Sequence, residues 1–437
     1  MSRIYKAAFI SVLSVMCAFS LKAEDENAHN SFSPYSLFGL GNMDKGGSAY
    51  NRTMGGVGIA SRSRSYINLL NPAALASRDT LSFMGDISLS VGNNFYSAEG
   101  KNSIKNTFNI SGIAFSFPIY KKSAFMVGLS PFSDVAFDYS ARETSNNMAV
   151  TNIITHTGTG NGGIYQLTAG AGATFGNFSA GAQLLYYFGS IKKEYAYTFT
   201  STSSNSILTG CEMHLNGTSA KLGVQYEKTL SNGLTLTAGL THRLPTRLHG
   251  DLRNYQLGVM SSMTDTLRND TLSLGGSKVR IASETGIGIS LRRGDKWMVE
   301  ADYVFSSWKS SNLDKVSGFA SSNSNISFAT SVSHSFRVGA EYTPNRNDIR
   351  YYLRRCAYRA GMYFDKAYFT AGGKPINTVG LTLGVTLPVF RLSNGLTLGV
   401  DMGQRGRTSG GLVRERYITF SVGFNIHDIW FRRPQYE

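Results

Sequence analysis

The sequence predicts an all-β protein, a fourteen-stranded antiparallel transmembrane β-barrel with an N-terminal hatch, or plug, in its lumen. Three observations favour this fold. From residue 81 onward, apolar residues alternate with small or polar ones, which is the period of a strand with one apolar face. Fourteen such runs follow one another, an even number as in bacterial outer-membrane barrels. Tight turns and long polar loops alternate between the runs, as periplasmic turns and extracellular loops do.

The runs are defined by strict alternation. In the last one, Ile418, Phe420 and Val422 alternate with Thr419 and Ser421. A membrane-spanning strand needs about 9–11 residues, and most runs reach that length. The runs begin near residues 81, 106, 123, 163, 178, 213, 233, 279, 296, 333, 356, 376, 395 and 414.

The connections fall into two classes. Asn-Gly and Gly-Asp pairs in the short ones supply the positive φ that hairpin turns require. The short turns lie at 121–123, 176–177, 231–233, 293–295 and 392–395, and the long loops at 140–161, 198–212, 246–278 and 308–332. A soluble β-sandwich also gives alternating strands, but it does not predict this alternation of connection lengths. The basic turn at 344–355 fits neither class.

The N-terminal residues predict export. Arg3 and Lys6 precede an apolar run over 7–21, and Ala23 offers a small residue for cleavage. A transmembrane anchor is the alternative, but an apolar run of about 15 residues is shorter than the roughly 20 needed to span a bilayer. We therefore expect a signal peptide over 1–23 and localisation in a Gram-negative outer membrane.

The composition favours one barrel over several soluble domains. The chain has 437 residues, of which 47 are Gly, 23 Tyr and 26 Phe, and only 16% are charged. Its length would suit two or three soluble domains, but no linker interrupts it. We expect a hatch over 24–80, a barrel over 81–428 and a C-terminal tail over 429–437.

The net charge of +15 raises the question of an anionic partner. Nucleic acid is one candidate, and the outer-membrane lipid with its lipopolysaccharide is the other. The basic residues are scattered along an exported chain, which favours the lipid and argues against nucleic acid.

Catalytic patterns are missing from the sequence. The seven His residues lack metal-site spacing, and no Ser, His and acidic residue group into a triad. Gly55-Gly56-Val57-Gly58 does not lie between a strand and a helix, so it does not predict a phosphate-binding loop. We expect no enzymatic activity, no metal and no cofactor.

Several lumen and wall residues are candidates for function. A lumen this wide must hold water, a ligand or a plug. Arg337, Glu341 and Arg359 are expected to point inward, where they either hold the plug or bind the anionic head of a ligand. Pro131 interrupts the third run, because proline cannot donate to the ladder; it marks either a bulge near the rim or an opening in the wall.

The segment from 50 to 73 is glycine-rich and precedes the strands. It contains Gly55 and Gly56 and ends in Asn71-Pro72-Ala73. It does not read as a long amphipathic helix, so we interpret it as the plug.

These features together resemble the FadL/TodX family of outer-membrane transporters of hydrophobic compounds. The hatch and Asn71-Pro72-Ala73 resemble that family's hatch and its Asn-Pro-Ala motif, and Ser130-Pro131-Phe132 lies where the family's third strand is kinked. The strand from Phe336 to Asn345, with Arg337, Gly339, Glu341 and Tyr342, is similar to an arginine–glycine–glutamate–tyrosine strand of the family.

The resemblance implies passive uptake by a monomer. A hydrophobic, fatty-acid-like molecule would bind in the lumen beside the hatch. Asn71, Pro72, Ala73, Gly55 and Gly56 would position the hatch and take part in its gating, and the ligand would leave sideways at Pro131. A FadL-like scaffold that binds a protein partner in secretion or surface attachment is the alternative.

Overall fold

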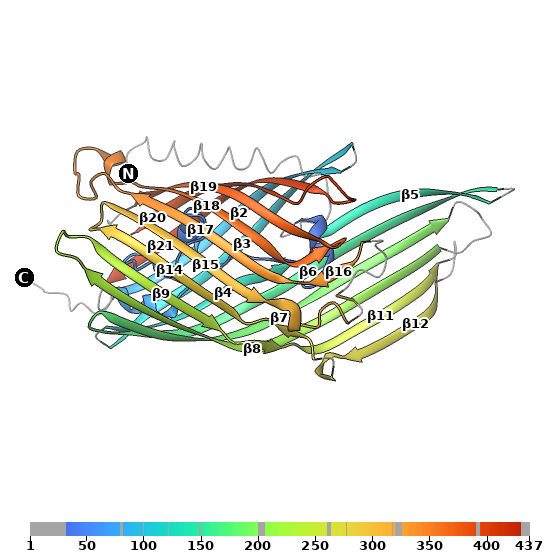
Figure 1. Ribbon diagram of the computed structural model, residues 1–437, viewed down its shortest axis with the longest axis horizontal. Helices are drawn as coiled ribbons and strands as arrows, with labels where there is room; N and C mark the ends of the chain where they lie inside the picture. Colours follow the sequence, from blue (N-terminus) through green and yellow to red (C-terminus); the bar gives the residue numbers. More distant parts are fainter. Residues whose placement is uncertain are drawn as a thin grey trace, which may run out of the picture.

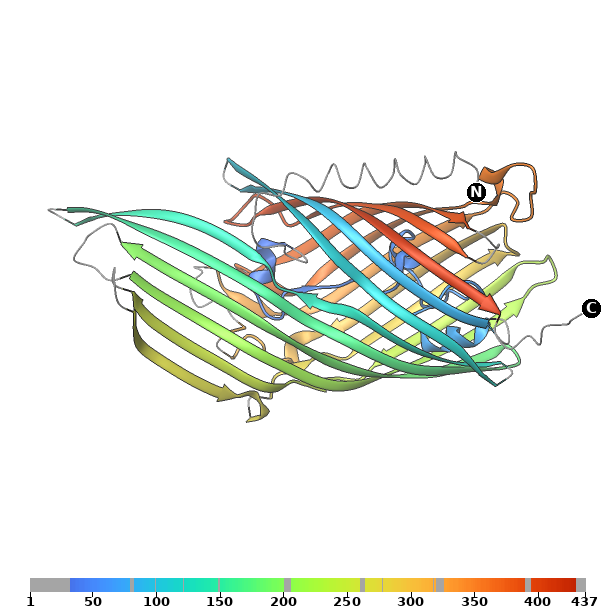
Figure 2. The same cartoon turned by 180° about the vertical axis from the view of Figure 1, so that it is seen from behind.

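The computed structural model is a long β-barrel with the N-terminal segment inside it (Figures 1 and 2). It describes residues 32–78, 82–98, 100–120, 122–147, 150–199, 206–259, 264–276, 278–316, 318–319, 326–389 and 394–429. The expected signal peptide lies outside the described residues, as do the expected hatch–barrel boundary at 80/81 and all but the first residue of the expected C-terminal tail.

Fourteen strands close the barrel in the described part of the chain, each antiparallel to its neighbours. β2 pairs with β21, which joins the first strand to the last. The strands are β2 (Ser82–Ala98), β3 (Lys101–Tyr120), β4 (Ser123–Asp134), β6 (Val150–Phe175), β7 (Phe178–Phe199), β8 (Ser206–Thr229), β9 (Thr235–Arg243), β14 (Glu284–Arg293), β15 (Trp297–Ser307), β17 (Val332–Tyr342), β18 (Ala357–Ala371), β19 (Lys374–Pro388), β20 (Gly395–Arg405) and β21 (Arg414–Ile429). The predicted fold class and strand number are confirmed.

Further strands extend the wall beyond the barrel at the end opposite the tight turns (Figure 1), which we call the outer end. β5 pairs with the outer half of β6, and β11 pairs with both β8 and β12. The expectation of irregular loops at 140–161 and 246–278 is therefore wrong over much of both ranges, because Thr- and Asn-rich sequence continues the strands there. The extending strands are β5 (Phe137–Asn147), β11 (His249–Val259) and β12 (Thr264–Ser273). The other short elements are β10 (Thr246–Arg247), β13 (Arg280–Ile281), β16 (Phe328–Thr330), η3 (Leu274–Gly276), η4 (Trp308–Ser310) and, in the connection from β17 to β18 at the tight-turn end, α3 (Tyr352–Arg355).

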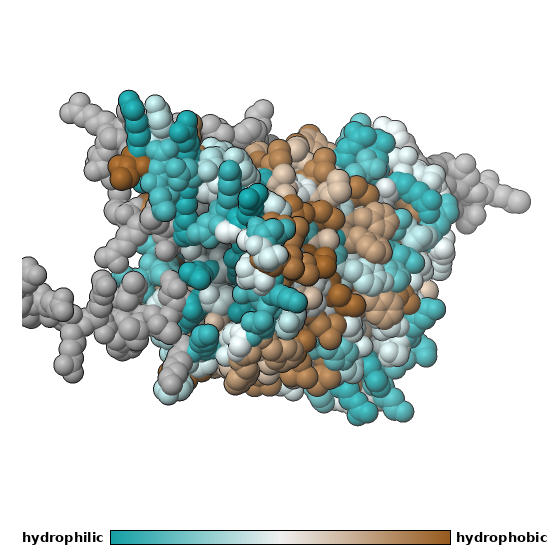
Figure 3. All heavy atoms as spheres, turned by 60° about the vertical axis from the view of Figure 1, so that its left-hand side comes forward, coloured by the Kyte–Doolittle hydropathy of each residue, from teal (hydrophilic) through white to brown (hydrophobic). Residues whose placement is uncertain are grey.

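The outer surface carries an apolar band. Brown spheres gather around the middle of the molecule in Figure 3, with hydrophilic residues on either side. Leu184, Ile289 and Leu381 belong to this surface and are more than half exposed. Apolar side chains directed outward from a closed barrel are those of a protein whose solvent is lipid. None of the described helices is long and apolar enough to cross a membrane.

The N-terminal residues 32–78, which we call the plug, lie inside the barrel (Figure 2). Their elements are η1 (Pro34–Leu37), β1 (Asn42–Met43), α2 (Ala49–Arg52) and η2 (Pro72–Ser77). Each is too short to bury an apolar face alone, so its order comes from the barrel around it. β1 pairs with the end of β4 and so joins the plug to the wall.

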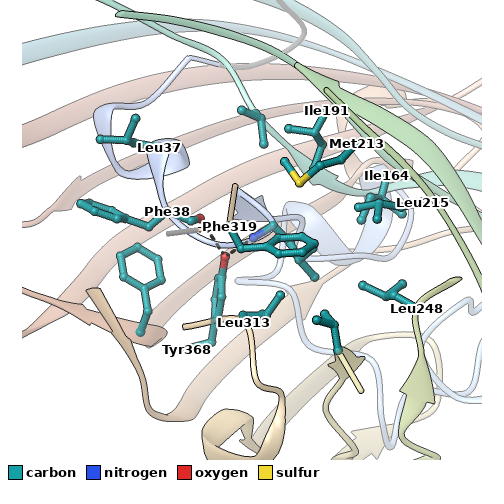
Figure 4. Close-up of a cluster of buried hydrophobic side chains, with 14 of the residues drawn as sticks. Leu37, Phe38, Ile164, Ile191, Met213, Leu215, Leu248, Leu313, Phe319 and Tyr368 are labelled. Atoms are coloured by element: carbon teal, nitrogen blue, oxygen red, sulfur yellow. Dashed lines mark hydrogen bonds between the residues drawn. The ribbon is translucent and has the colours of Figure 1, made fainter. Parts of the chain in front are cut away.

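An apolar cluster fills the lumen toward the outer end (Figure 4). Leu37 and Phe38 enter it from the plug, and Leu313 and Phe319 enter it from the connection after η4. Tyr368 lies at its centre, where its hydroxyl accepts a hydrogen bond from the Leu40 amide at 3.0 Å and donates to plug carbonyls. The plug therefore forms one core with residues 308–316 and 318–319, which we call the 308–319 segment.

Candidate functional site

Asn71-Pro72-Ala73 lies against a patch of inward-facing glycines on three neighbouring strands. A side chain at Gly172, Gly181 or Gly223 would overlap Asn71 or Pro72. The plug backbone therefore rests on the strand backbone. Several inward glycines of the sequence pattern thus have a packing reason, which is the close approach of the plug.

Asn71 organises the plug around this contact. Its side chain accepts from the Ala73 amide at 3.0 Å, which caps η2, and donates to the Ile59 carbonyl at 2.7 Å. Asn71 and Ala73 are fully buried. Pro72 follows at the first helical position, where its fixed φ suits a helix start. The Asn-Pro-Ala sequence is therefore a capped turn that also joins two parts of the plug.

Gly55 and Gly56 form a tight turn near β17 and β18. Both have positive φ, which glycine adopts without strain. The Gly55 amide donates to Thr382 Oγ1 at 2.7 Å, and the Gly56 carbonyl accepts from Arg337 Nη1 at 3.1 Å. A Cβ on Gly55 would lie 2.9 Å from both the Val338 and the Met362 carbonyl oxygens.

Two carboxylates of β15 hold the next part of the plug. Asp302 accepts from the Gly58 and Ile59 amides at 2.7 and 3.0 Å, and Glu300 accepts from the Ala60 amide at 2.8 Å. Both are buried. Our candidate site residues did not include them. Glu300 and Asp302 lie two residues apart in an alternating run, which directs both side chains to the same face, and this spacing is the signal that could have found them.

Arg337, Glu341 and Arg359 all serve the plug region. Arg337 bonds the Gly56 carbonyl and approaches Asp365 at 3.9 Å. Arg359 pairs with Glu341 at 2.7 Å, and its guanidinium carbon lies 4.3 Å from the centre of the Tyr50 ring. Of the two roles expected for these residues, holding the plug and binding the anionic head of a ligand, these contacts belong to the first.

A cavity of about 240 Å³ lies in the lumen between the plug and the wall. Pro131, Phe132 and Leu69 contribute apolar lining, while strands across the lumen contribute charges of both signs. The charged side chains of the lining are Asp44, Lys45, Lys221, Arg243, Glu284, Asp302, Arg337, Asp365, Lys366 and Arg405. Such a lining suits an amphipathic molecule better than a purely apolar one. Among the described residues, no group of His, Cys, Asp or Glu could hold a metal ion.

Lys45 links the plug to β20 beside this cavity. Its ammonium group lies 2.6 Å from Asp401 and 3.5 Å from the centre of the Tyr363 ring. Burial lowers the pKa of Lys45, and the Asp401 carboxylate opposes that shift. The cation thus has a carboxylate and an aromatic face in place of water.

Pro131 lies where the barrel wall divides. β4 pairs with β3 only up to Leu129, and its register with β6 shifts between Pro131 and Ser133. Beyond that point, residues Lys101–Gly112 of β3 pair only with β2, and β5 pairs only with β6. In the described part of the chain no ladder joins β3 to β5. We call this interruption the seam (Figure 2).

The plug covers the seam from inside. The Ser33 amide donates to the Ala136 carbonyl at 2.9 Å beside β5, and Tyr96 of β2 donates to the Phe32 carbonyl at 2.7 Å. Lys105 and Asp138, on opposite sides of the seam, approach to 3.9 Å. Residues 32–36 therefore bridge the two parts of the wall.

Lys193 is a further lumen residue that sequence reasoning missed. It points inward from β7, almost fully buried, and donates to the carbonyls of Leu37 at 2.8 Å and Gly318 at 3.1 Å. It thus ties the plug to the 308–319 segment. In the sequence Lys193 lies between Lys192 and Glu194, so no change from polar to apolar residues marks it as inward-pointing.

Comparison with known proteins places the fold and the family. The family model described as BamG matches residues 5–437. The chain belongs to the BamG family. No curated protein matches the sequence.

Solved structures similar to this BamG-family chain are FadL-type barrels. The Pseudomonas putida toluene transporter TodX has a TM-score of 0.57 at 13% identity, over 89% of this chain and 100% of that one. The Ralstonia pickettii toluene transporter TbuX has a TM-score of 0.54 at 14% identity, over 87% and 98%. A Pseudomonas aeruginosa FadL homologue has a TM-score of 0.54 at 12% identity, over 89% and 99%. The predicted resemblance to FadL/TodX proteins is confirmed for the fold, which is that of outer-membrane barrels.

Proposed function

We propose that this BamG-family barrel lets a hydrophobic small molecule with a polar end pass through the outer membrane. The observation that carries the proposal is the seam at Pro131, which borders a lumen cavity and is covered from inside by the plug. The structural neighbours TodX and TbuX, described as toluene transporters, have the same architecture.

Lateral exit through the seam suits an apolar solute. A molecule that leaves the lumen sideways moves into hydrocarbon without first entering water, so its apolar surface stays out of water. Ile104, Phe108 and Ile110 of β3 present apolar side chains at the seam and are at least half exposed. The route needs no energy source, since transfer follows the concentration gradient.

The plug and the outer apolar cluster would act as successive gates. A molecule that arrives from the outer end meets Phe38 and Phe319, which belong to the same apolar cluster. It can pass only if the 308–319 segment and plug residues 37–40 separate, which breaks the hydrogen bonds of Lys193. Asn71, Pro72, Ala73, Gly55 and Gly56 then form the anchored part of the hatch, and Pro131 shapes the exit.

Arg337, with Lys45 and Lys221 nearby in the cavity lining, would receive the polar end of the molecule. Arg359 and Glu341 would not take part, because they bond one another and the far side of the plug. A fatty acid has the required chemistry, with an apolar tail and a carboxylate.

The test is uptake of a fluorescent dodecanoic acid by cells that carry the full chain in the outer membrane. Pro131→Val restores a backbone donor at the seam, and we expect the initial uptake rate to fall several-fold. Pro118→Val, in the part of β3 that pairs with β4, is the matched control and should transport normally. Normal uptake by a correctly folded Pro131→Val barrel would remove the lateral-exit proposal.

A protein-binding scaffold is the second candidate. One observation favours it: the outer lumen is already filled by the chain's own apolar side chains, with Leu40, Leu313 and Phe319 fully buried. Native mass spectrometry with lipid extraction separates the two. A bound apolar molecule supports transport, and an empty lumen with a co-purifying protein supports the scaffold.

A further inference from the structure

A second cavity opens at the tight-turn end of the barrel. It has a volume of about 490 Å³ and lies between plug residues 61–66, the ends of several strands and the basic connection 343–356. Six arginines and three carboxylates line it, so the lining carries a net charge of +3. In outer-membrane barrels the tight turns are periplasmic, which places this mouth in the periplasm.

Four of the six arginines have carboxylate partners. These pairs are Arg359–Glu341 at 2.7 Å, Arg346–Asp295 at 3.4 Å, and Arg62 and Arg292 with Glu227 at 3.4 and 3.9 Å.

The other two, Arg64 and Arg355, have no ion pair within the described ranges. Arg64 is exposed at the mouth. Arg355 has a buried Nε without a hydrogen-bond partner, and its guanidinium lies 5.0 Å from the centre of the Tyr352 ring. Uncompensated cations in a cavity favour an anionic occupant.

The connection 343–356 is built as a fixed platform beside these arginines. Asp348 accepts from the Arg350 and Tyr351 amides at 2.9 and 2.8 Å, and the Asn345 amide donates to the Arg354 carbonyl at 2.8 Å. The plug contributes as well, since Arg346 donates to Ser65 Oγ at 3.1 Å.

The platform exposes apolar side chains to water. Ile349 is fully exposed and Leu353 is 68% exposed. The connection begins and ends beyond the cross-strand pair Tyr342–Tyr358, whose exposed rings mark the border of the apolar band. Apolar side chains grouped beside a charged cavity indicate a protein contact.

We propose that this mouth docks an extended acidic segment of a periplasmic protein. Its carboxylates pair with Arg64 and Arg355, and its apolar side chains cover Ile349 and Leu353. A lipid headgroup fits less well, because the cavity lies between the plug and the strand ends and not on the lipid-facing wall. The proposal does not depend on transport, because it uses neither the seam nor the lumen cavity.

The probe is a fluorescein-labelled ten-residue peptide of alternating Glu and Leu, titrated with the full chain in detergent micelles and followed by anisotropy. We expect saturable binding that Arg64→Gln and Arg355→Gln each weaken about tenfold, since charge-assisted hydrogen bonds are lost. Arg268→Gln, an exposed arginine on β12 at the other end, is the matched control and should bind like the wild type. If Arg355→Gln does not fold, the peptide affinity of Arg64→Gln still tests the proposal, because Arg64 is exposed.

Two further measurements separate an acidic peptide from other occupants. The double variant Ile349→Ser/Leu353→Ser should weaken the Glu/Leu peptide several-fold and leave a Glu/Ser peptide unchanged. Equal binding of the Glu/Leu peptide to all arginine variants overturns the proposal. It is also overturned if the variants alter binding only to phosphatidylglycerol vesicles, which would assign the mouth to lipid.

Discussion

Gly181→Ala should release the plug while leaving the barrel closed. Gly181 lies at the centre of the glycine patch on β7, under Pro72. A Cβ there would lie 2.5 Å from Pro72 C, 2.6 Å from Pro72 O and 2.8 Å from Ala73 N. All three are backbone atoms, so no side chain can rotate away, and an ordinary contact begins at 3.4 Å. The plug must therefore move by about 1 Å.

The cost falls on the hatch. Overpacking of this kind costs about 1–3 kcal/mol. Movement of Pro72 also strains the bonds from Asn71 to Ala73 and Ile59, each of which contributes about 1 kcal/mol. A loss of about 3 kcal/mol raises the population of the displaced plug roughly a hundredfold, because 1.4 kcal/mol corresponds to a factor of ten.

Single-channel recording in planar bilayers checks this prediction. The wild type should conduct rarely, and Gly181→Ala should open far more often, while heat-modifiable mobility on gels confirms a folded barrel. Gly85→Ala is the matched control, since a Cβ there meets the Phe115 ring at an ordinary 3.5 Å on the outer face. An open probability equal to that of the wild type, in a folded Gly181→Ala barrel, would refute the idea that Pro72 rests on this glycine.

Two further substitutions probe the plug and its contact with the wall, one at Asn71 of the plug and one at Lys193 of β7. Asn71→Ala removes both the cap of η2 and the bond to the Ile59 carbonyl. It should cost about 2 kcal/mol, at about 1 kcal/mol for each bond, seen as faster proteolysis of the plug. Asn71→Ser, which keeps a capping oxygen, should lose less. Lys193→Met removes the donor to three carbonyls, those of Leu37, Gly39 and Gly318, and should raise hydrogen exchange at 37–40 and 311–316 about tenfold. Lys192→Met, on the exposed side of β7, should not. Unchanged exchange in Lys193→Met would mean that the lysine does not hold the outer gate.

The strand order was predictable because its signal is local. Each barrel strand has its own alternation of apolar and polar residues, so the fourteen runs correspond to the fourteen barrel strands, from β2, which begins at Ser82, to β21, which begins at Arg414. The extension β12 was missed because every one of its residues is exposed and both of its faces are mostly polar, so alternation gives no contrast.

The site was less predictable because it depends on contacts between distant segments. Asn71-Pro72-Ala73 was recognisable as a motif, yet nothing local in the sequence connects it with the three glycines that support it, Gly172, Gly181 and Gly223. Lys193 gave no signal at all, since its partners Leu37 and Gly318 lie more than 120 residues away. Arg337 and Arg359 were correctly placed in the lumen, but alternation cannot tell a plug contact from a ligand contact.

For the seam, the sequence pattern identified Pro131 but could not choose between a bulge near the rim and an opening in the wall. Pro131 was compatible with a harmless bulge or an opening, and the difference lies in whether β3 finds another partner. Residues 101–112 of β3 do not pair with β5. An unpaired backbone group at a strand edge costs free energy unless water or another segment of the chain pairs with it. In the described chain β3 lacks a neighbour on one side over residues 101–112, whereas the outer parts of β6 and β8 pair with β5 and β11. The interruption, with plug residues 32–36 behind it, thus depends on segments far apart in the chain, and it is the feature on which the proposed lateral exit rests.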